Sequence, residues 1–330
     1  MTVANPCQTG ILHDWSLFVI IAENMIEMRK SIVAFAVAVI LAGYSQGLFS
    51  QAPDTTQGWD KSGVFSLNMS QATFTNWAAG GQNSVALNGL LNFTANYKKG
   101  KSAWDNALTV GYGKMIQKGN DLGWVKTDDR IDFQSKYGHK ASDKWFYTGL
   151  MSFRTQMDNG YNYPDTENRI SSLLAPAYLL FSLGMDYKPN PQFSVFLSPL
   201  TSKNTIVMDD QLSAMGAFGV DPGKKFRTEL GAYANIAYKK DEIVKNVNFL
   251  TKLDLFTNYL KNPQNIDISW EALLVLKVNQ FLSATVNTHL MYDDDVLIKV
   301  GEGNEGEPVM GKRAQFKEVI GVGFTYKFIK

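Results

Sequence analysis

An alternation of apolar and polar residues runs to the end of the chain and constrains the fold more than any other feature of the sequence. The last 16 residues read QFKEVIGVGFTYKFIK (315–330). One parity carries Phe316, Ile320, Val322, Phe324, Tyr326 and Phe328, and the other carries Gln315, Lys317, Gly321, Gly323, Thr325 and Lys327. A period of two is that of a β-strand, whose side chains point alternately to its two faces. Such a strand suits a soluble sandwich or an outer-membrane barrel.

The same alternation recurs along the chain after Ala52, where no stretch has sustained helical periodicity. In one segment, for example, Ile268, Trp270 and Leu274 alternate with Asp267 and Glu271. Twelve strands are predicted in this way. They are 63–73, 84–98, 102–116, 126–138, 143–156, 175–187, 192–206, 226–239, 246–259, 265–278, 281–293 and 314–328.

The lengths of these strands and the positions of their aromatic residues favour a membrane barrel over a soluble sandwich. Strands of soluble proteins are most often about 5–6 residues long, whereas tilted strands that cross a bilayer need about 9–11. Aromatic residues gather near the strand ends, as in the interfacial girdles of outer-membrane barrels. They are Tyr97, Trp104, Tyr137, Trp145, Tyr187, Tyr238, Tyr259, Tyr292 and Phe328.

The connections between the predicted strands alternate between short and long. The short ones are 99–101, 139–142, 188–191, 240–245 and 279–280. The long ones are 74–83, 117–125, 157–174, 207–225 and 294–313, and only 260–264 departs from the pattern. Short periplasmic turns and long outer loops are typical of outer-membrane barrels, whose sheet closes because no free edge can be solvated in hydrocarbon. The sequence therefore predicts a transmembrane antiparallel up-and-down β-barrel of about 12 strands.

The front of the chain predicts export. Residues 28–52, MRKSIVAFAVAVILAGYSQGLFSQA, place Arg29 and Lys30 before an apolar run and end near an A-x-A-like cleavage site, which is the pattern of a signal peptide. Residues 1–27 fit neither an export signal nor a folded domain, so we expect an upstream extension from a misassigned start. Residues 53–330 are then expected to form a single barrel domain in a bacterial outer membrane.

The composition of residues 53–330 excludes two further classes of protein. The only cysteine, Cys7, precedes the predicted signal peptide, so the barrel domain has no disulfide framework and no thiolate metal site. Removing the two basic and three acidic residues of the first 52 leaves 30 basic and 28 acidic residues. A balance so close to neutral predicts no nucleic-acid partner.

Six segments resemble a known family of secreted proteins. They are WDNALTVGYG (104–113), KTDDRIDFQSKYGHKA (126–141), LAPAYLLFSLGMDYKPN (174–190), FSVFLSPLTSKNTIV (193–207), TKLDLFTNYLKNPQNIDISWE (251–271) and QFKEVIGVGFTYKF (315–328). The family is an uncharacterised Bacteroidetes-type group known only as a domain of unknown function, for which an outer-membrane barrel is expected. The resemblance covers nearly all of the chain from about Trp59 and implies no activity, so it transfers no catalytic residue.

Charged side chains of both signs fall on the parity that would face the barrel lumen. The candidate lumen-lining residues are Asp105, Arg130, Asp132, Lys136, Arg154, Glu229, Lys252, Asp254, Asp267, Glu271, Lys277, His289 and Lys317. They favour either a polar pore whose charges select solutes or a plugged lumen whose charges pair between strands. The first hypothesis is a channel or transport component for small polar solutes, and the alternative is a surface binding or structural barrel.

A membrane-embedded hydrolase is the third hypothesis, because His289 and Asp293 share a face. Ser283 lies six residues from His289 on the same face, a separation of about 20 Å along a strand, and no nucleophile motif is present. We expect no catalytic residue, no cofactor and no metal site. Residues 293–295 carry three aspartates that could bind calcium, but they lack the glycine and glutamate of a calcium loop and predict a solvated strand end.

Two segments predict contacts with partners. Phe324, Tyr326 and Phe328 resemble the C-terminal assembly strand that the barrel assembly machinery recognises, although Ile329 and Lys330 follow the last aromatic residue. The tyrosine-containing loop 158–169 could stack on sugars or simply pack over the barrel mouth. The expected partners are therefore outer-membrane lipid, the assembly machinery, and an unknown small polar solute or surface ligand.

Overall fold

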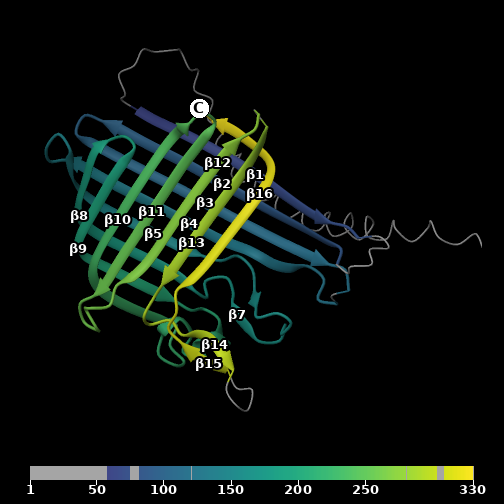
Figure 1. The fold of residues 1–330 in the computed structure, drawn as a ribbon. Helices are drawn as coiled ribbons and strands as arrows, with labels where there is room; N and C mark the ends of the chain where they lie inside the picture. The colour runs from purple at the N-terminus through teal and green to yellow at the C-terminus, as the bar shows by residue number, and fades with distance from the viewer. Residues whose placement is uncertain (1–57, 75–81, 120, 280, 303–307, 330) are drawn as a thin grey trace, which may run out of the picture. The chain divides into compact units, whose positions relative to one another are not determined.

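A closed antiparallel β-barrel of twelve strands makes up the body of the protein (Figure 1). The computed structural model describes residues 58–74, 82–119, 121–279, 281–302 and 308–329. The predicted upstream extension and signal peptide lie outside these residues. Among the described residues, no helix is both long and apolar enough to cross a membrane.

The barrel strands follow one another in the ring with nearest-neighbour connections. They are β1 (Gly58–Ala72), β2 (Ser84–Lys99), β3 (Ser102–Gln117), β4 (Val125–Lys140), β5 (Trp145–Thr155), β8 (Ala177–Asn190), β9 (Phe193–Ile206), β10 (Phe226–Val244), β11 (Val247–Asn258), β12 (Asp267–Lys277), β13 (Leu282–Tyr292) and β16 (Gln315–Ile329). The ring closes where β16 pairs with β1, with Phe324 opposite Leu67 and Tyr326 opposite Phe65. The two strands pair over Gly63–Asn68 and Gly323–Ile329, so the sheet closes on itself as a bilayer requires.

All twelve predicted strands are confirmed, and the fold class predicted from the sequence is correct. The structure adds small elements that the alternation did not reveal, and all of them lie in the long loops. These are two hairpins, β6 (Gly160–Tyr161) with β7 (Arg169–Ser171) and β14 (Ile298–Glu302) with β15 (Pro308–Gly311), the helix α2 (Asp210–Ala214) and the 3-10 turn η1 (Ala217–Gly219). Such short elements carry too few residues for a periodic pattern to form.

The apolar parity faces outward. In β16, Phe316, Ile320, Val322, Phe324 and Tyr326 are exposed, and the residues between Val319 and Thr325 on the other parity are half-buried. The same outward exposure holds on other strands, at Leu67, Met69, Trp104, Trp145, Phe181, Leu183, Leu197, Leu200, Leu230 and Trp270. A continuous apolar surface around a closed barrel is costly in water and favourable in lipid.

Aromatic rings gather at the end of the barrel that carries the short turns. Trp59 packs against Tyr97 and Trp104 with ring centroids 5.2 and 5.6 Å away, and Trp145 lies 4.9 Å from Tyr187. Tyr97, Trp104, Trp145 and Tyr187 are among the aromatic positions predicted from the sequence, whereas Trp59 was not predicted. In outer-membrane barrels, aromatic rings near the strand ends lie at the interface between the membrane and water.

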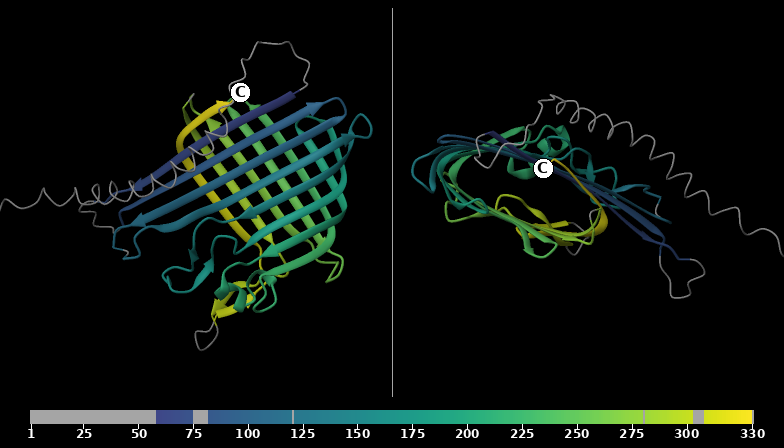
Figure 2. Two further views of the ribbon diagram at one scale, coloured as in Figure 1. Left: turned by 180° about the vertical axis from the view of Figure 1, so that it is seen from behind. Right: turned by 90° about the horizontal axis from the view of Figure 1, so that it is seen from above.

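The barrel is oval when it is seen along its axis (Figure 2). Strands β3 and β4 belong to one long wall, and β11 and β12 belong to the wall that faces it (Figure 2). In the ring order, five strands separate β4 from β12 on either side. Side chains from these two walls can therefore meet only by crossing the lumen.

Candidate functional site

The lumen is crossed at mid-barrel by ion pairs between facing walls. Arg130 of β4 donates to Glu271 of β12, with the Nη1 and Oε2 atoms 2.8 Å apart. Lys317 of β16 reaches Asp128 of β4 at 2.6 Å, also between strands that are not neighbours. We call Asp128, Arg130, Asp132, Arg154, Glu271 and Lys317 the middle layer. Because charged atoms of facing walls are in contact here, the middle layer constricts the pathway through the barrel.

Glu271 is the hub of the middle layer. Its carboxylate accepts from Arg154 of β5 at 3.0 Å as well as from Arg130, and Arg154 also donates two hydrogen bonds to Asp132, at 2.8 and 3.1 Å. His289 lies 3.8 Å from Glu271 and 3.1 Å from the Ser269 hydroxyl. The side chains of Arg130 and Glu271 are only 12% and 16% exposed, so water screens the pair weakly.

Hydrogen-bonded polar groups of β10 and β11 extend the middle layer along their side of the lumen. Lys252 pairs with Asp254 at 3.3 Å. Asp254 also accepts from the Tyr233 hydroxyl at 2.5 Å and from the Asn235 amide at 2.7 Å. An apolar cluster of Leu150, Phe196, Tyr233 and Phe256 is buried beside these groups. This side of the lumen is therefore filled by the protein's own side chains.

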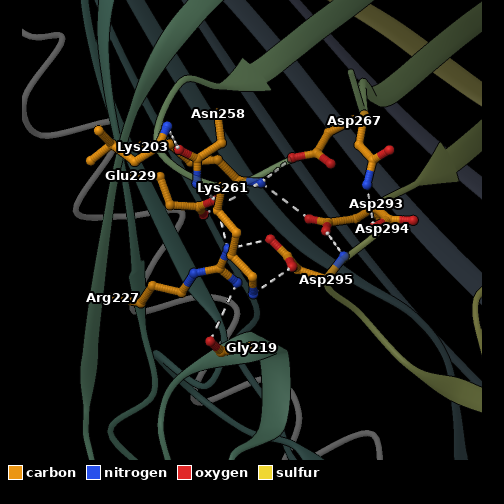
Figure 3. Close-up of polar contacts among 12 residues, drawn as sticks. Lys203, Gly219, Arg227, Glu229, Asn258, Lys261, Asp267, Asp293, Asp294 and Asp295 are labelled. Atoms are coloured by element: carbon orange, nitrogen blue, oxygen red, sulfur yellow. Dashed lines mark hydrogen bonds and ion pairs between the residues drawn. The ribbon is translucent and has the colours of Figure 1, made fainter. Parts of the chain in front are cut away.

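A second set of ion pairs closes the end of the barrel that carries the long loops (Figure 3). Lys203 of β9 contacts Asp267 at 2.6 Å and Asp293 at 3.1 Å. Arg227 of β10 binds Glu229 at 2.7 Å and also pairs with Asp295. We call Lys203, Arg227, Glu229, Lys261, Asp267, Asp293 and Asp295 the mouth layer. The cavity within it is only about 10 Å³, roughly room for one water molecule.

The mouth layer joins three loops at this end of the barrel to one another (Figure 3). Asp295 follows β13 and pairs with Lys261, in the loop between β11 and β12, at 3.0 Å. Arg227 donates to the Gly219 carbonyl of the η1 turn at 3.3 Å. Asp294 pairs with Lys312 at 2.7 Å, which fastens the loop from β13 to β16 to itself. The three loops thus form one connected cap.

The three aspartates after β13 do not form the solvated strand end that the sequence predicted. Asp293 and Asp295 are only 18% and 23% exposed, because they turn back into the mouth and meet Lys203 and Arg227. Burial alone would raise the pKa of Asp295, but hydrogen bonds from Arg227 and Lys261 outweigh it and hold the pKa below the ordinary value of 3.8. Short-range periodicity cannot predict these pairs, since their basic partners come from other strands and loops.

Toward the short turns the lumen carries a third charged cluster and is more open. Lys136 of β4 and Lys188 of β8 contact the fully buried Asp186 at 3.0 and 3.3 Å, and Lys188 also pairs with Asp105. Among the lumen-facing residues at this end, Ala107 and Lys277 are exposed, and Leu250 is 40% exposed. The lumen is therefore accessible from the short-turn side and constricted toward the long loops.

Every predicted lumen residue lies on the lumen-facing parity of a barrel strand, and all except Lys277 and His289 take part in the ion pairs above. Asp128 was also predicted to face the lumen, on the parity of Arg130. The sequence missed Lys203, Arg227 and Lys188 as members of these clusters. His139 is exposed near the end of β4 and was predicted to lie in the turn that follows.

The tyrosine-containing loop 158–169 is held against β4. The Tyr163 hydroxyl accepts from the Lys126 backbone N–H at 3.3 Å, and the Lys126 amine donates to the Asp158 carbonyl at 2.9 Å. The Tyr161 and Tyr163 rings lie 6.1 Å apart. These contacts support the packing interpretation of this loop over sugar stacking.

The geometry around His289 offers no hydrolytic site. The hydroxyl next to its ring belongs to Ser269 of the neighbouring strand, whereas Ser283 lies near the other end of β13. Asp293, the predicted partner of His289, is engaged by Lys203. Within the described residues, no group of three or more His, Cys, Asp or Glu side chains is arranged to hold a metal ion.

Comparison with known proteins finds a match to a family of unknown function over part of the chain. A family model described as a protein of unknown function, DUF3078, matches residues 69–161, from the second half of β1 to β6. The predicted resemblance to an uncharacterised family is confirmed over this segment. No curated protein matches the sequence.

Several solved outer-membrane barrels are distantly similar to the chain. The NanC porin is 10% identical with a TM-score of 0.36, covering 80% of this chain and 98% of its own. An outer membrane channel from Pseudomonas putida F1 is 8% identical with a TM-score of 0.38, covering 86% of this chain and 100% of its own. The translocator domain of the autotransporter NalP from Neisseria meningitidis is 10% identical with a TM-score of 0.32, covering 92% of this chain and 98% of its own. Because these sequence identities and TM-scores are low, the similarity carries no functional argument, and the function is argued from the geometry of the lumen.

Proposed function

We propose that the protein is an outer-membrane channel for small polar solutes, with a pathway constricted by the middle and mouth layers. The observation that carries the proposal is the pair Arg130–Glu271, which places opposite charges of facing walls in contact inside a closed barrel. Rings and layers of charged side chains in a lumen are the elements with which channels select solutes. The open short-turn side, where Ala107 and Leu250 are accessible, supplies a vestibule that leads to this constriction.

Placement in the outer membrane is supported by the outward apolar parity. A barrel with Ile320, Val322 and Phe324 exposed side by side would associate in water, whereas hydrocarbon accommodates them. The alternation of short turns and long loops then directs the long loops to the cell exterior, as in other barrels of this type. The cap would lie at the outer surface, and the vestibule would open to the periplasm.

The test of the channel is electrical. Protein refolded into planar lipid bilayers in molar potassium chloride is expected to give discrete conductance steps as single barrels insert. Folding should be verified in parallel by the resistance of the barrel to sodium dodecyl sulfate without heating. Folded barrels that give no steps at any voltage or salt concentration would rule the channel out.

A filled structural or ligand-binding barrel is the second candidate, and the same wall-to-wall contacts favour it. If Glu271 binds Arg130 and Arg154 permanently, the middle layer is a plug that holds the facing walls in register. The cap of three tied loops would then be the functional surface. Electrical silence of folded barrels is the result that this candidate predicts, so the same recording separates the two.

A further inference from the structure

The lumen has a neutral wall that the ion pairs do not occupy. On β2 the lumen-facing side chains Asn88, Asn92, Thr94 and Asn96 are uncharged and polar, and next to them on β3 are Ala107 and Thr109. We call these six residues the neutral wall. Asp105, the charged lumen residue of β3, lies opposite Asn96 at the short-turn end of this wall and pairs with Lys188. Asp132, the carboxylate beside Thr109, is paired with Arg154. Solutes that follow β2 and β3 would therefore meet neutral hydrogen-bonding groups and charges that already have a partner.

The neutral wall is less buried than several carboxylates of the charged half of the lumen. Ala107 is exposed although it faces inward, and Asn92, Thr94 and Asn96 are half-buried. In the charged half, Asp132, Asp186 and Glu229 are 8%, 0% and 3% exposed. The polar side chains of the neutral wall are therefore accessible to small solutes in the lumen.

Hydrogen-bonding capacity on the neutral wall is left unused by the protein. Asn92 accepts from the Thr109 hydroxyl at 2.9 Å, which leaves its amide N–H groups free. Among the described residues, the side chains of Thr94 and Asn96 have no hydrogen-bond partner. Beside them Asn88 lies flat over Gly113, where a Cβ would come within 1.9 Å of its Oδ1 atom. The glycine thus lets an amide lie against the wall instead of projecting into the lumen.

The charged half of the lumen offers little net charge to a passing solute. The Glu271 carboxylate is shared by Arg130 and Arg154, Asp132 is bound by Arg154, and Asp128 is bound by Lys317. Paired charges in contact cancel at distances beyond their own separation, so they attract neither cations nor anions strongly. An ion that entered the neutral wall would lose hydration without gaining a counter-charge, which costs more than the partial desolvation of a neutral solute.

We propose that the neutral wall is a binding and passage site for small neutral polyhydroxylated solutes, such as monosaccharides or polyols. Hydroxyl groups both donate and accept hydrogen bonds, as do the amides of Asn92 and Asn96 and the hydroxyl of Thr94. The site discriminates against charged solutes of the same size. This inference rests on the proposed channel function, which the experiment tests separately.

Liposome swelling measures the proposed preference directly. Proteoliposomes are placed in isosmotic glucose, glucosamine or glucuronate, three sugars of similar size that are neutral, cationic and anionic at neutral pH. Glucose is expected to enter roughly tenfold faster than either charged sugar, a ratio that corresponds to about 1.4 kcal/mol of difference in barrier. If the charged sugars enter as fast as glucose, the inference is wrong while the channel stands. If no sugar enters and bilayers show no conductance, the channel itself fails.

The variant N92D/N96D identifies the wall that is responsible. Two carboxylates on the neutral wall are expected to slow glucuronate further, to speed glucosamine several-fold and to reduce the preference for glucose. Asn279→Asp is the control, because Asn279 lies in the short turn after β12 and caps the Phe281 and Leu282 amides through an oxygen that aspartate retains. An unchanged order of the three rates in folded N92D/N96D protein would contradict passage along β2 and β3.

Discussion

The substitution Glu271→Gln should destabilise the barrel more than any single change in a surface ion pair. Glu271 accepts charge-assisted hydrogen bonds from Arg130 at 2.8 Å and Arg154 at 3.0 Å. Removing one partner of a buried pair costs about 3–5 kcal/mol, because the other charge remains buried without compensation. Asp132 still binds Arg154 and glutamine keeps one acceptor oxygen, so the loss should fall at the lower end, about 3 kcal/mol.

Urea unfolding of the barrel in lipid vesicles measures this loss. The matched control is Asp143→Asn, which removes a carboxylate from the pair with Lys140 in a short turn, where Asp143 is 97% exposed. Exposed pairs contribute about 0–1 kcal/mol, so the control should unfold almost as the wild type does. If Glu271→Gln and Asp143→Asn lose the same free energy of unfolding, the facing walls are not joined by Glu271 and the reasoning is refuted.

Three further predictions concern the outer face, the orientation and the cap. Leu255→Lys, on the outward parity of β11, should lower the free energy of unfolding by about 2–4 kcal/mol in vesicles if it lies near the bilayer midplane. The control Leu260→Lys, at a loop position that is 78% exposed, should change this free energy little. Equal effects of the two substitutions would place the outer face in water. On intact cells, an impermeant thiol reagent should label single cysteines placed at Leu173 or Val309 but not at Asn190, and the reverse pattern would invert the orientation. Because the pKa of Asp295 lies below its ordinary value in the folded protein, the contribution of Asp295 to the cap is present above about pH 4 and disappears as the pH falls through that lowered pKa. A nitroxide label at position 309 of the otherwise wild-type protein should then become more mobile on acidification. In the Asp295→Asn variant the same label should be mobile already at pH 7. A label that is equally restrained in the wild type and in the variant at pH 7 would show that Asp295 does not hold the cap.

The strands were predictable because the bilayer imposes a rule on every residue. In β16, Phe316, Ile320 and Phe324 must face hydrocarbon, and a strand places them on one parity without help from the rest of the fold. The same rule applies to each of the other strands, so local alternation alone was sufficient. The loops lie outside the bilayer and have no such alternation, so the hairpins β6–β7 and β14–β15 were not predicted.

The lumen residues were predictable as a set, but their partners were not. Parity places Arg130 and Glu271 inside the barrel, yet their contact depends on the oval cross-section that brings β4 opposite β12. Likewise, the turn of Asp293 and Asp295 into the mouth depends on Lys203 and Arg227, which approach from β9 and β10. These contacts between distant segments decide whether the lumen is filled or open, which is why sequence alone left both alternatives standing.

The conductance of single barrels with Glu271→Gln tests the central claim most directly, namely that a channel is constricted at the middle layer. Loss of the carboxylate charge weakens the contact of Arg130 and Arg154 with the facing wall and leaves one positive charge in excess, because Asp132 still pairs with Arg154. Single-barrel conductance should rise above that of the wild type, and the reversal potential in a salt gradient should shift toward anion selectivity. Conductance and selectivity equal to those of the wild type and of Asp143→Asn, in protein shown to be folded, would contradict a constriction at Glu271.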